Sequence, residues 1–376
     1  MSAGIIEHFV NLPDPRVNRT KRYPLIEILF LVIAAIVSGC EGWQQIKDFG
    51  EAKLDWLRKF FPYVEGIPVD DTIARLMRRL DTKAFKACFL SWMNAVSDAT
   101  NGDIIAIDGK TLRGSQDRKN GRSPIHMVSA WSNQNGVVLG QEKTDEKSNE
   151  ITAIPKLLEV LDISGCIVTI DAMGCQTKIA AQIVNKSADY LLSLKGNQGN
   201  LHAEIKDYFE CAFDKDFKNI HYSHHQDIDA GHGRIEEREC WVVKAEEKHI
   251  PSIVKWKNLE NIVAVKSTRT VENKISSETR FFITSATLDA KKALNVTRAH
   301  WGIESLHWTL DVSFGEDKSR VRAGASAENL GVMRHIALNL LKKDRSRKIS
   351  MPRKRKFAAY EDAYREELIK NGLSLS

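Results

Sequence analysis

The sequence contains few cysteines, and none of them forms a recognisable motif. Six cysteines are spread over 376 residues, and no two of them have CxxC spacing. Disulfide frameworks and cysteine-rich zinc sites both depend on such pairing. We therefore expect neither kind of site, and a reducing, cytosolic environment fits the pattern best.

Long apolar runs are also missing. The most hydrophobic stretch, residues 28–37, lies between Glu27 and Ser38-Gly39. A membrane-spanning helix needs about 20 apolar residues, so we interpret this stretch as a buried core helix. The first residues show no basic region followed by an apolar segment and a small-residue cleavage site, so no signal peptide is expected. The sequence thus predicts no membrane association.

Positive charge is present but concentrated. The net charge is +6, and residues 342–356 contain nine basic residues and one acidic residue. The rest of the chain is therefore slightly acidic. A patch of this kind commonly binds nucleic acid, but a solvated charged segment is an equally open interpretation. We define residues 342–376 as the basic C-terminal tail.

Residues 1–97 have the pattern of an all-helical domain, for which DNA binding is a possible role. Apolar residues recur at helical spacing in four stretches, 25–37, 42–61, 71–80 and 84–96. The turn-forming residues 100–102 then separate this domain from the rest of the chain.

The next region, residues 98–341, changes to a strand pattern. Three expected strands come first, with a hairpin signal at residues 133–136, and helices then alternate with strands. A three-stranded meander followed by this alternation is the order of an RNase H-like core, although several α/β folds share it. The expected strands are 103–108, 125–131, 137–143, 167–171 and 190–194, and the expected helices are 151–161 and 177–187.

Residues 197–285 interrupt that alternation as a β-rich insertion. One helix at 201–213 leads into strands expected at 236–243, 262–268 and 277–283. The helical pattern returns at residue 289 and resumes from 327 to 343. The predicted fold class is therefore α/β, an RNase H-like mixed sheet with flanking helices, a β-rich insertion and an N-terminal helical domain.

Two of the expected strands end on an aspartate. Asp108 follows residues 104–107, and Asp171 follows residues 167–170. Open α/β sheets place their chemistry at the carboxyl ends of strands, so both carboxylates are candidates for a site. For Asp108 the alternative is a turn residue, because Asp-Gly is a common turn pair. No such turn is expected at Asp171.

A third carboxylate, Glu304, lies in a segment rich in tryptophan and histidine. On a helix, His300, Glu304, either His307 or Trp308, and Asp311 fall three or four residues apart and share nearly one face. An exposed polar stripe or a core histidine would also explain this pattern.

Taken together, these segments resemble the H-repeat-associated (Rhs-element) family of insertion-sequence transposases, which use a DDE triad. The resemblance covers nearly the whole chain, and its last motif is highly specific. The matching stretches are DPR (14–16), YPLIEILFLVIAAIVSG (23–39), IDGKTLRGS (107–115), TIDAMGCQ (169–176), YLLSLKGNQ (190–198), HGRIEER (232–238) and RAHWGIESLHWTLDVSFGEDKSR (298–320).

The resemblance implies that Asp108, Asp171 and Glu304 are the catalytic, metal-binding triad of a DNA endonuclease and strand-transfer enzyme encoded by a mobile genetic element. Such chemistry uses two Mg²⁺ ions about 4 Å apart, one activating the attacking oxygen and one stabilising the leaving oxygen. Three carboxylates, water and DNA phosphate supply the oxygen ligands that Mg²⁺ prefers. Mn²⁺ is an alternative ion. We expect Asp108 to bridge both ions.

The chain departs from the tyrosine, arginine, glutamate, lysine signature of the wider group. Thr297, His300 and Asp311 occupy the places of the tyrosine, the arginine and the lysine. DNA contacts must therefore come partly from other residues. The candidates for DNA contact are Lys110, Arg113, Lys195, Arg298, His300, Lys318, Arg320 and Arg322.

The expected function is DNA transposition, with cleavage at the ends of the element and strand transfer into target DNA. The alternative is a transposase remnant that retains only DNA nicking or DNA binding. The implied partner is double-stranded DNA, both the terminal repeats and the target, with a homodimer in the DNA complex. The implied location is the bacterial cytoplasm, in association with the nucleoid.

Overall fold

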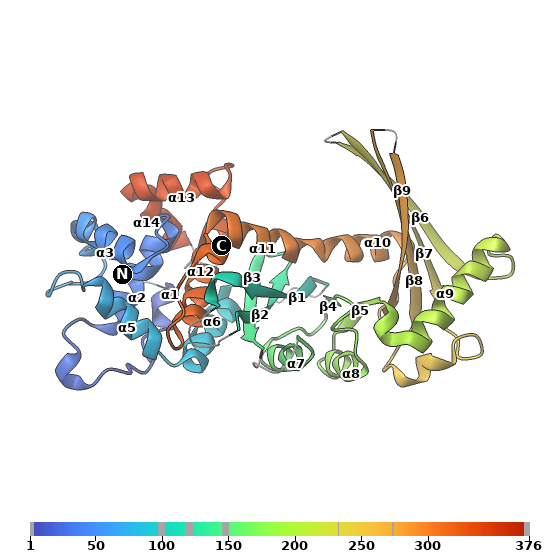
Figure 1. The fold of residues 1–376 in the computed structure, drawn as a ribbon, viewed down its shortest axis with the longest axis horizontal. Helices are drawn as coiled ribbons and strands as arrows, with labels where there is room; N and C mark the ends of the chain where they lie inside the picture. The colour runs from blue at the N-terminus through green and yellow to red at the C-terminus, as the bar shows by residue number, and fades with distance from the viewer. Residues whose placement is uncertain are drawn as a thin grey trace.

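The computed structural model describes residues 4–96, 102–116, 123–144, 150–231, 233–272 and 274–371. A long mixed sheet runs through the molecule, with a helical region at the end where the chain begins (Figure 1). The helical region contains α1 (Gly4–Glu7), α2 (Leu25–Val37), α3 (Trp43–Ala52), α4 (Leu54–Leu57), α5 (Asp70–Arg79) and α6 (Thr82–Val96).

Helix α2 is the core of the helical region. Every residue from Ile28 to Val37 is buried, and α2 packs against α3 and against the late helix α12 (Ser326–Lys343). The buried Glu27 at its start accepts a hydrogen bond from the backbone N–H of Tyr63. The prediction of a core helix is therefore confirmed. In the part of the chain that the structure describes, no helix has the length and apolar character needed to cross a membrane.

Five strands form the first half of the sheet, in the order β3-β2-β1-β4-β5. Strand β1 pairs in parallel with β4, and β4 in parallel with β5, whereas β2 is antiparallel to both β1 and β3. This is the RNase H-like arrangement that the order of expected elements indicates. The strands are β1 (Ile104–Leu112), β2 (Ile125–Ser132), β3 (Val137–Lys143), β4 (Ile167–Ile170) and β5 (Asp189–Leu194).

The insertion extends the same sheet to nine strands. Strand β9 (Lys274–Thr284) pairs antiparallel with β5, and β8 (Asn261–Val271), β7 (Arg234–Lys244) and β6 (Tyr222–Gly231) follow outward. The three strands expected in the insertion are confirmed, with longer bounds. Strand β6 was not predicted, because this edge strand is largely exposed and lacks the apolar alternation of a half-buried strand. Its sequence pattern therefore resembles a loop.

Helices cover both faces of the sheet (Figure 1). One face carries α7 (Glu150–Val160) and α8 (Thr177–Asn185), which pack on strands β2, β3 and β5. The other face carries α10 (Ala290–Ala299) and α11 (Trp301–Ser313), a nearly continuous helical run that crosses the sheet. Helix α9 (Gly199–Asp214) packs on β9 of the insertion.

The segment expected as a basic tail is folded, which corrects that expectation for residues 342–371. After α12, the chain forms α13 (Met351–Tyr360) and α14 (Asp362–Asn371), both of which contact α2. Three of the basic side chains in this segment, Lys354, Arg355 and Arg365, are buried. The Lys354 ammonium donates to the carbonyl of Leu341 and so caps the end of α12. Much of the positive charge in the segment is therefore used inside the protein.

Candidate active site

The register of the sheet brings Asp108 and Asp171 side by side. Strands β1 and β4 pair up to Ile107 and Ile170, so both aspartates directly follow the last parallel pair. The expectation that a strand ends at Asp108 is wrong, however. Strand β1 continues to Leu112 because residues 108–112 still pair with β2. Asp108 therefore projects from a strand that is held on one side only, next to the end of β4.

Asp171 begins a turn, contrary to the sequence expectation. Its Oδ1 atom accepts the backbone N–H groups of Met173, at 3.0 Å, and Gly174, at 3.2 Å. An aspartate that accepts N–H groups two and three residues ahead forms an Asx turn, which fixes its side chain at the strand end. The carboxylate is thus held in place by its own loop.

Helix α11 brings Glu304 to the same place. Asp108, Asp171 and Glu304 all line one cleft with a volume of about 370 Å³. Gly302 allows the helix to lie this close to the sheet, because a Cβ atom there would be 2.6 Å from Asn133 Oδ1 and 2.8 Å from Trp131 Nε1. The three carboxylates predicted from the sequence therefore converge on a single cavity.

The cleft brings several carboxyl groups together, and Asp108 and Glu304 among them are partly removed from water. Burial raises the pKa of Asp108 to about 7, and the neighbouring carboxylates Glu150, Asp171 and Glu304 add to this effect. Burial also raises the pKa of Glu304, against an opposing effect from Arg280. A bound cation would stabilise the ionised forms of Asp108 and Glu304, whose pKa values are raised in this way.

Oxygen donors of this kind fit Mg²⁺ or Mn²⁺. Among the described residues, no three His, Cys, Asp or Glu side chains are close enough to form a ready-made metal cluster. Mg²⁺ keeps several waters and is commonly held by one or two carboxylates plus phosphate oxygens, so a complete protein cage is not required. The donor set therefore suits a metal ion that completes its coordination shell with water or with a phosphate oxygen.

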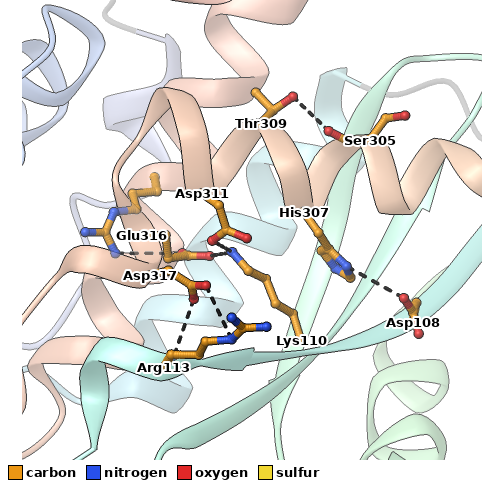
Figure 2. Close-up of polar contacts among 10 residues, drawn as sticks. Asp108, Lys110, Arg113, Ser305, His307, Thr309, Asp311, Glu316 and Asp317 are labelled. Atoms are coloured by element: carbon orange, nitrogen blue, oxygen red, sulfur yellow. Dashed lines mark hydrogen bonds and ion pairs between the residues drawn. The ribbon is translucent and has the colours of Figure 1, made fainter.

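His307 lies directly beside Asp108. The two side chains approach to 3.6 Å between His307 Nδ1 and Asp108 Oδ2 (Figure 2). Burial, together with the positive charge of Lys110, lowers the pKa of His307 to about 3. The imidazole is therefore neutral at physiological pH, and the contact is not an ion pair. The helical face predicted for Glu304 included His307, but its contact with Asp108 was not predicted.

Lys110 does not have the role expected for it. Its Nζ atom lies 2.5 Å from Asp311 Oδ1 and 2.6 Å from Glu316 Oε2, and its side chain is only 9% exposed (Figure 2). Both carboxylates lie some 200 residues further along the chain, so no local pattern pointed to them. Lys110 is an internal counter-ion, which leaves it unavailable to a DNA duplex.

Lys195 and His300 line the carboxylate cleft itself. Lys195 is exposed there, whereas the His300 Nδ1 atom lies 3.0 Å from the hydroxyl of Thr169 on β4. Burial lowers the pKa of His300, so a positive charge at this position is disfavoured. Of these two candidates for DNA contact, Lys195 is the positively charged one. His300 instead connects the helical run to strand β4 through Thr169.

Arg298 and Arg113 do not line the carboxylate cleft. Arg298 pairs with Asp227 of β6 at 2.6 Å, so part of its charge is neutralised within the protein. The Arg113 side chain is 83% exposed, and its ion pair with Asp317 is long, at 3.7 Å. Arg113 is therefore the more available of the two.

The last three candidates line a second groove. Lys318, Arg320 and Arg322 lie with Arg75 and Arg78 of α5 around a hollow of about 870 Å³ between the helical region and the loop after α11. Acidic residues, among them Asp70 and Asp71, also line it. Lys318, Arg320 and Arg322 are exposed, although the Arg322 Nε atom donates to the Gly114 carbonyl at 3.0 Å.

Sequence reasoning missed two residues that line the cleft. Arg280, from strand β9 of the insertion, and the half-exposed Trp301, at the start of α11, both face it. Only the pairing of β9 with β5 brings Arg280 near the carboxylates, and no spacing in the sequence encodes that pairing. The unusual tryptophan content of the Glu304 segment was the available signal for Trp301.

The fold and this cleft define an RNase H-like protein with a carboxylate site at the strand ends. Residues 99–340 match the family described as "Transposase DDE domain", and residues 6–93 match the one described as "DDE_Tnp_1-associated". The chain therefore belongs to the DDE transposase family.

Several proteins resemble the whole chain. "Putative transposase YncI" of Escherichia coli O157:H7 is 44% identical, over 97% of this chain and 94% of that protein. "H repeat-associated putative transposase YhhI" of Escherichia coli K12 is 41% identical, over 96% of both chains. Among solved structures, the piggyBac transposase in a synaptic complex with hairpin DNA aligns with a TM-score of 0.47 at 10% identity, over 98% of this chain and 77% of that one. The relatives agree with the resemblance drawn from the sequence motifs.

Proposed function

We propose that the protein is an insertion-sequence transposase that cuts DNA at the ends of its element and joins those ends to target DNA. Asp108, Asp171 and Glu304 are the proposed catalytic and metal-binding residues, with Mg²⁺ or Mn²⁺ as the cofactor. The observation that carries this proposal is the convergence of all three carboxylates on one cleft at the strand ends. Membership of the DDE transposase family supports it.

The charged residues of the cleft have two roles in this proposal, metal binding and phosphate binding. Asp108 and Asp171 hold metal from the sheet, and Glu304 holds it from helix α11. Bound divalent ions supply Lewis acidity for the attacking and leaving oxygens. Lys195 and Arg280 line the same cleft, where their positive charges attract a DNA phosphate.

Two reactions take place in turn in this proposal. Water attacks the phosphodiester bond at the element's end, and the bond to the 3′ oxygen breaks, which leaves a 3′-hydroxyl. That hydroxyl then attacks a phosphodiester bond of the target, loses its proton and displaces the target's own 3′ oxygen. We propose that two copies of the chain act together, one for each end, on nucleoid DNA in the cytoplasm.

The test uses the purified protein, Mg²⁺ and DNA that carries the terminal repeats flanking the gene. Asp108→Ala and Glu304→Ala are each expected to lower cleavage by several orders of magnitude, because each removes a residue on which the whole site depends. The exposed Glu247→Gln is the matched control and is expected to cleave normally.

The outcomes separate the alternatives. Cleavage that survives both alanine substitutions contradicts the triad assignment. Nicking without joined products favours a remnant, a possibility made concrete by a 45% identical relative named "Inactive transposase YbfQ", which matches 19% of this chain. Loss of activity in Asp311→Ala but not in Glu304→Ala shows that the wrong helix residue was assigned to the triad.

A further inference from the structure

Three polar side chains of helix α11 lie in a row beside strand β1. On the helix, Glu304 lines the cleft. His307 approaches Asp108, and Asp311 approaches Lys110 (Figure 2). Spacings of three and four residues place these helix positions on one face. On the strand, residues 108 and 110 share a face because side chains alternate. The helix and the strand therefore meet along matching rows.

Lys110 ties three elements together at the end of this row. Its ammonium contacts Asp311 on α11 and Glu316 of the short helix η6 (Glu316–Lys318), while its backbone belongs to β1. Glu316 is itself almost fully buried, and Arg334 of α12 also approaches it, at 3.7 Å. Buried charges are costly unless they are paired, so this cluster holds its members in one arrangement.

The tie acts on the position of Glu304 through a rigid element. Asp311 lies seven residues after Glu304, which is about two helical turns or roughly 10 Å. Lys110 lies two residues after Asp108, about 7 Å along the strand. A shift of α11 at the Lys110 end therefore moves Glu304 relative to Asp108, since the helix between them does not bend easily.

We propose that Lys110 is a positioning residue that fixes helix α11 against strand β1 and thereby sets Glu304 opposite Asp108. It lines none of the carboxylate cleft and contacts no reacting group. The proposal rests on the proposed function, because it concerns the site formed by the three carboxylates. The competing interpretation is a buried ion cluster that stabilises the fold and nothing else.

The chain offers a matched control in Lys86. This lysine of α6 also lies between two carboxylates, at 3.0 Å from Glu142 Oε2 and 2.6 Å from Glu328 Oε1, and its side chain is 17% exposed. Neither Lys86 nor its partners line the carboxylate cleft. A loss of stability alone should therefore appear equally in Lys86→Met and Lys110→Met.

The experiment measures Mn²⁺ binding to the full chain without DNA, from the electron paramagnetic resonance signal of free Mn²⁺, with thermal unfolding recorded in parallel. Lys110→Met is expected to weaken Mn²⁺ binding by about 10-fold, the range seen when residues that orient a metal ligand are removed. Lys110→Arg is expected to restore binding, because it keeps the charge. Lys86→Met is expected to bind Mn²⁺ like the unaltered protein.

A double variant distinguishes positioning from general destabilisation. If Lys110 acts through Glu304, Lys110→Met adds no further loss of Mn²⁺ affinity in a Glu304→Ala background. The positioning role is overturned if the losses of Mn²⁺ affinity from Lys110→Met and Glu304→Ala add up in the double variant. It is also overturned if Lys110→Met binds Mn²⁺ as well as the unaltered protein does. Unchanged binding in Glu304→Ala alone overturns the triad assignment itself, so the two failures are distinguishable.

Discussion

Two groups of basic side chains look alike in the sequence but differ in what surrounds them. Lys318, Arg320 and Arg322 are exposed around the groove beside the helical region. The C-terminal segment 342–371 has more positive charge, yet it folds into helices that pack on α2. The smaller group is therefore the more available to DNA.

Arg355 shows what the C-terminal charges do instead. Its guanidinium donates to the carbonyl of Ile36 at the end of α2 and to the carbonyl of Ser313 at the end of α11, and its carbon Cζ lies 4.3 Å from the centre of the Phe314 ring. Cations near helix C-termini complete unsatisfied carbonyl groups and complement the helix dipole. A high density of basic residues in a sequence thus does not show that their side chains are exposed or that they bind DNA.

The largest effect is expected from Arg355→Met, which keeps the bulk of the side chain and removes its donors. The carbonyls of Ser313 and Ile36 each lose a buried donor, and Ile36 keeps the N–H of Gly39, so the free energy of unfolding should fall by about 3 kcal/mol. Urea unfolding measures this, with the exposed Lys356→Met as control, for which about 0.5 kcal/mol or less is expected. Equal stability of the two variants would show that the buried charge of Arg355 does not stabilise the fold, and would contradict the difference drawn between the C-terminal segment and the groove residues.

Acid is expected to destabilise the protein through the buried, uncharged histidine His335. Burial lowers the pKa of His335, on α12, to about 4, from 6.5 when it is unfolded. Between these pH values only the unfolded chain binds the proton, so stability is complete above pH 6.5 and falls as the pH drops toward 4. The loss is on the order of 3 kcal/mol. Unfolding free energies measured across this range should lose most of that slope in His335→Leu; an unchanged slope assigns it to other groups.

The exposed group is expected to affect DNA binding rather than stability. Replacing Lys318, Arg320 and Arg322 together by alanine should weaken DNA binding and reduce the dependence of log K on log salt by about 2 to 3, since each phosphate contact contributes about 0.9. Fluorescence anisotropy at several salt concentrations measures the slope. A slope that stays the same excludes this groove as a phosphate-binding surface.

The smallest effect is expected from the exposed basic residues of the C-terminal segment. Arg345, Lys348 and Arg353 are exposed, and their joint replacement by alanine should change the same salt slope by less than about 1. Deleting the whole segment is a poorer test, because it also removes Arg355. A drop as large as that of the groove variant would make both groups DNA contacts.

The sequence predicted the sheet half that carries the site and the carboxylates themselves. The apolar runs that lead to Asp108 and Asp171 could be placed because most of their residues are buried. The continuation of β1 to Leu112 could not, because Gly109, Lys110 and Thr111 are held by pairing with β2 rather than by their own apolar character. The edge strand β6 was missed for the same reason.

Contacts between distant segments were the other limit. Lys110 and Arg355 are basic residues, a type that commonly contacts DNA. Only folding brings Glu316 next to Lys110 and the Ile36 carbonyl next to Arg355. A buried side chain that donates to a backbone carbonyl cannot be predicted from residue types, because every residue has that carbonyl. Resemblance to a family pointed to the three carboxylates that line the cleft, but not to the side chains that hold their strands and helix in place.

The hold of Arg355 on the end of α11 has a consequence for the order in which the protein is made. During synthesis Asp108 and Asp171 emerge early, Glu304 much later, and Arg355 later still. Domains fold from the N-terminus as they leave the ribosome, so the strands can assemble while α11 is still without its C-terminal brace. A nascent chain that stops short of Glu304 thus carries two of the three carboxylates and cannot complete the cleft. Only a copy translated past Arg355 presents all three carboxylates with helix α11 held at its C-terminal end.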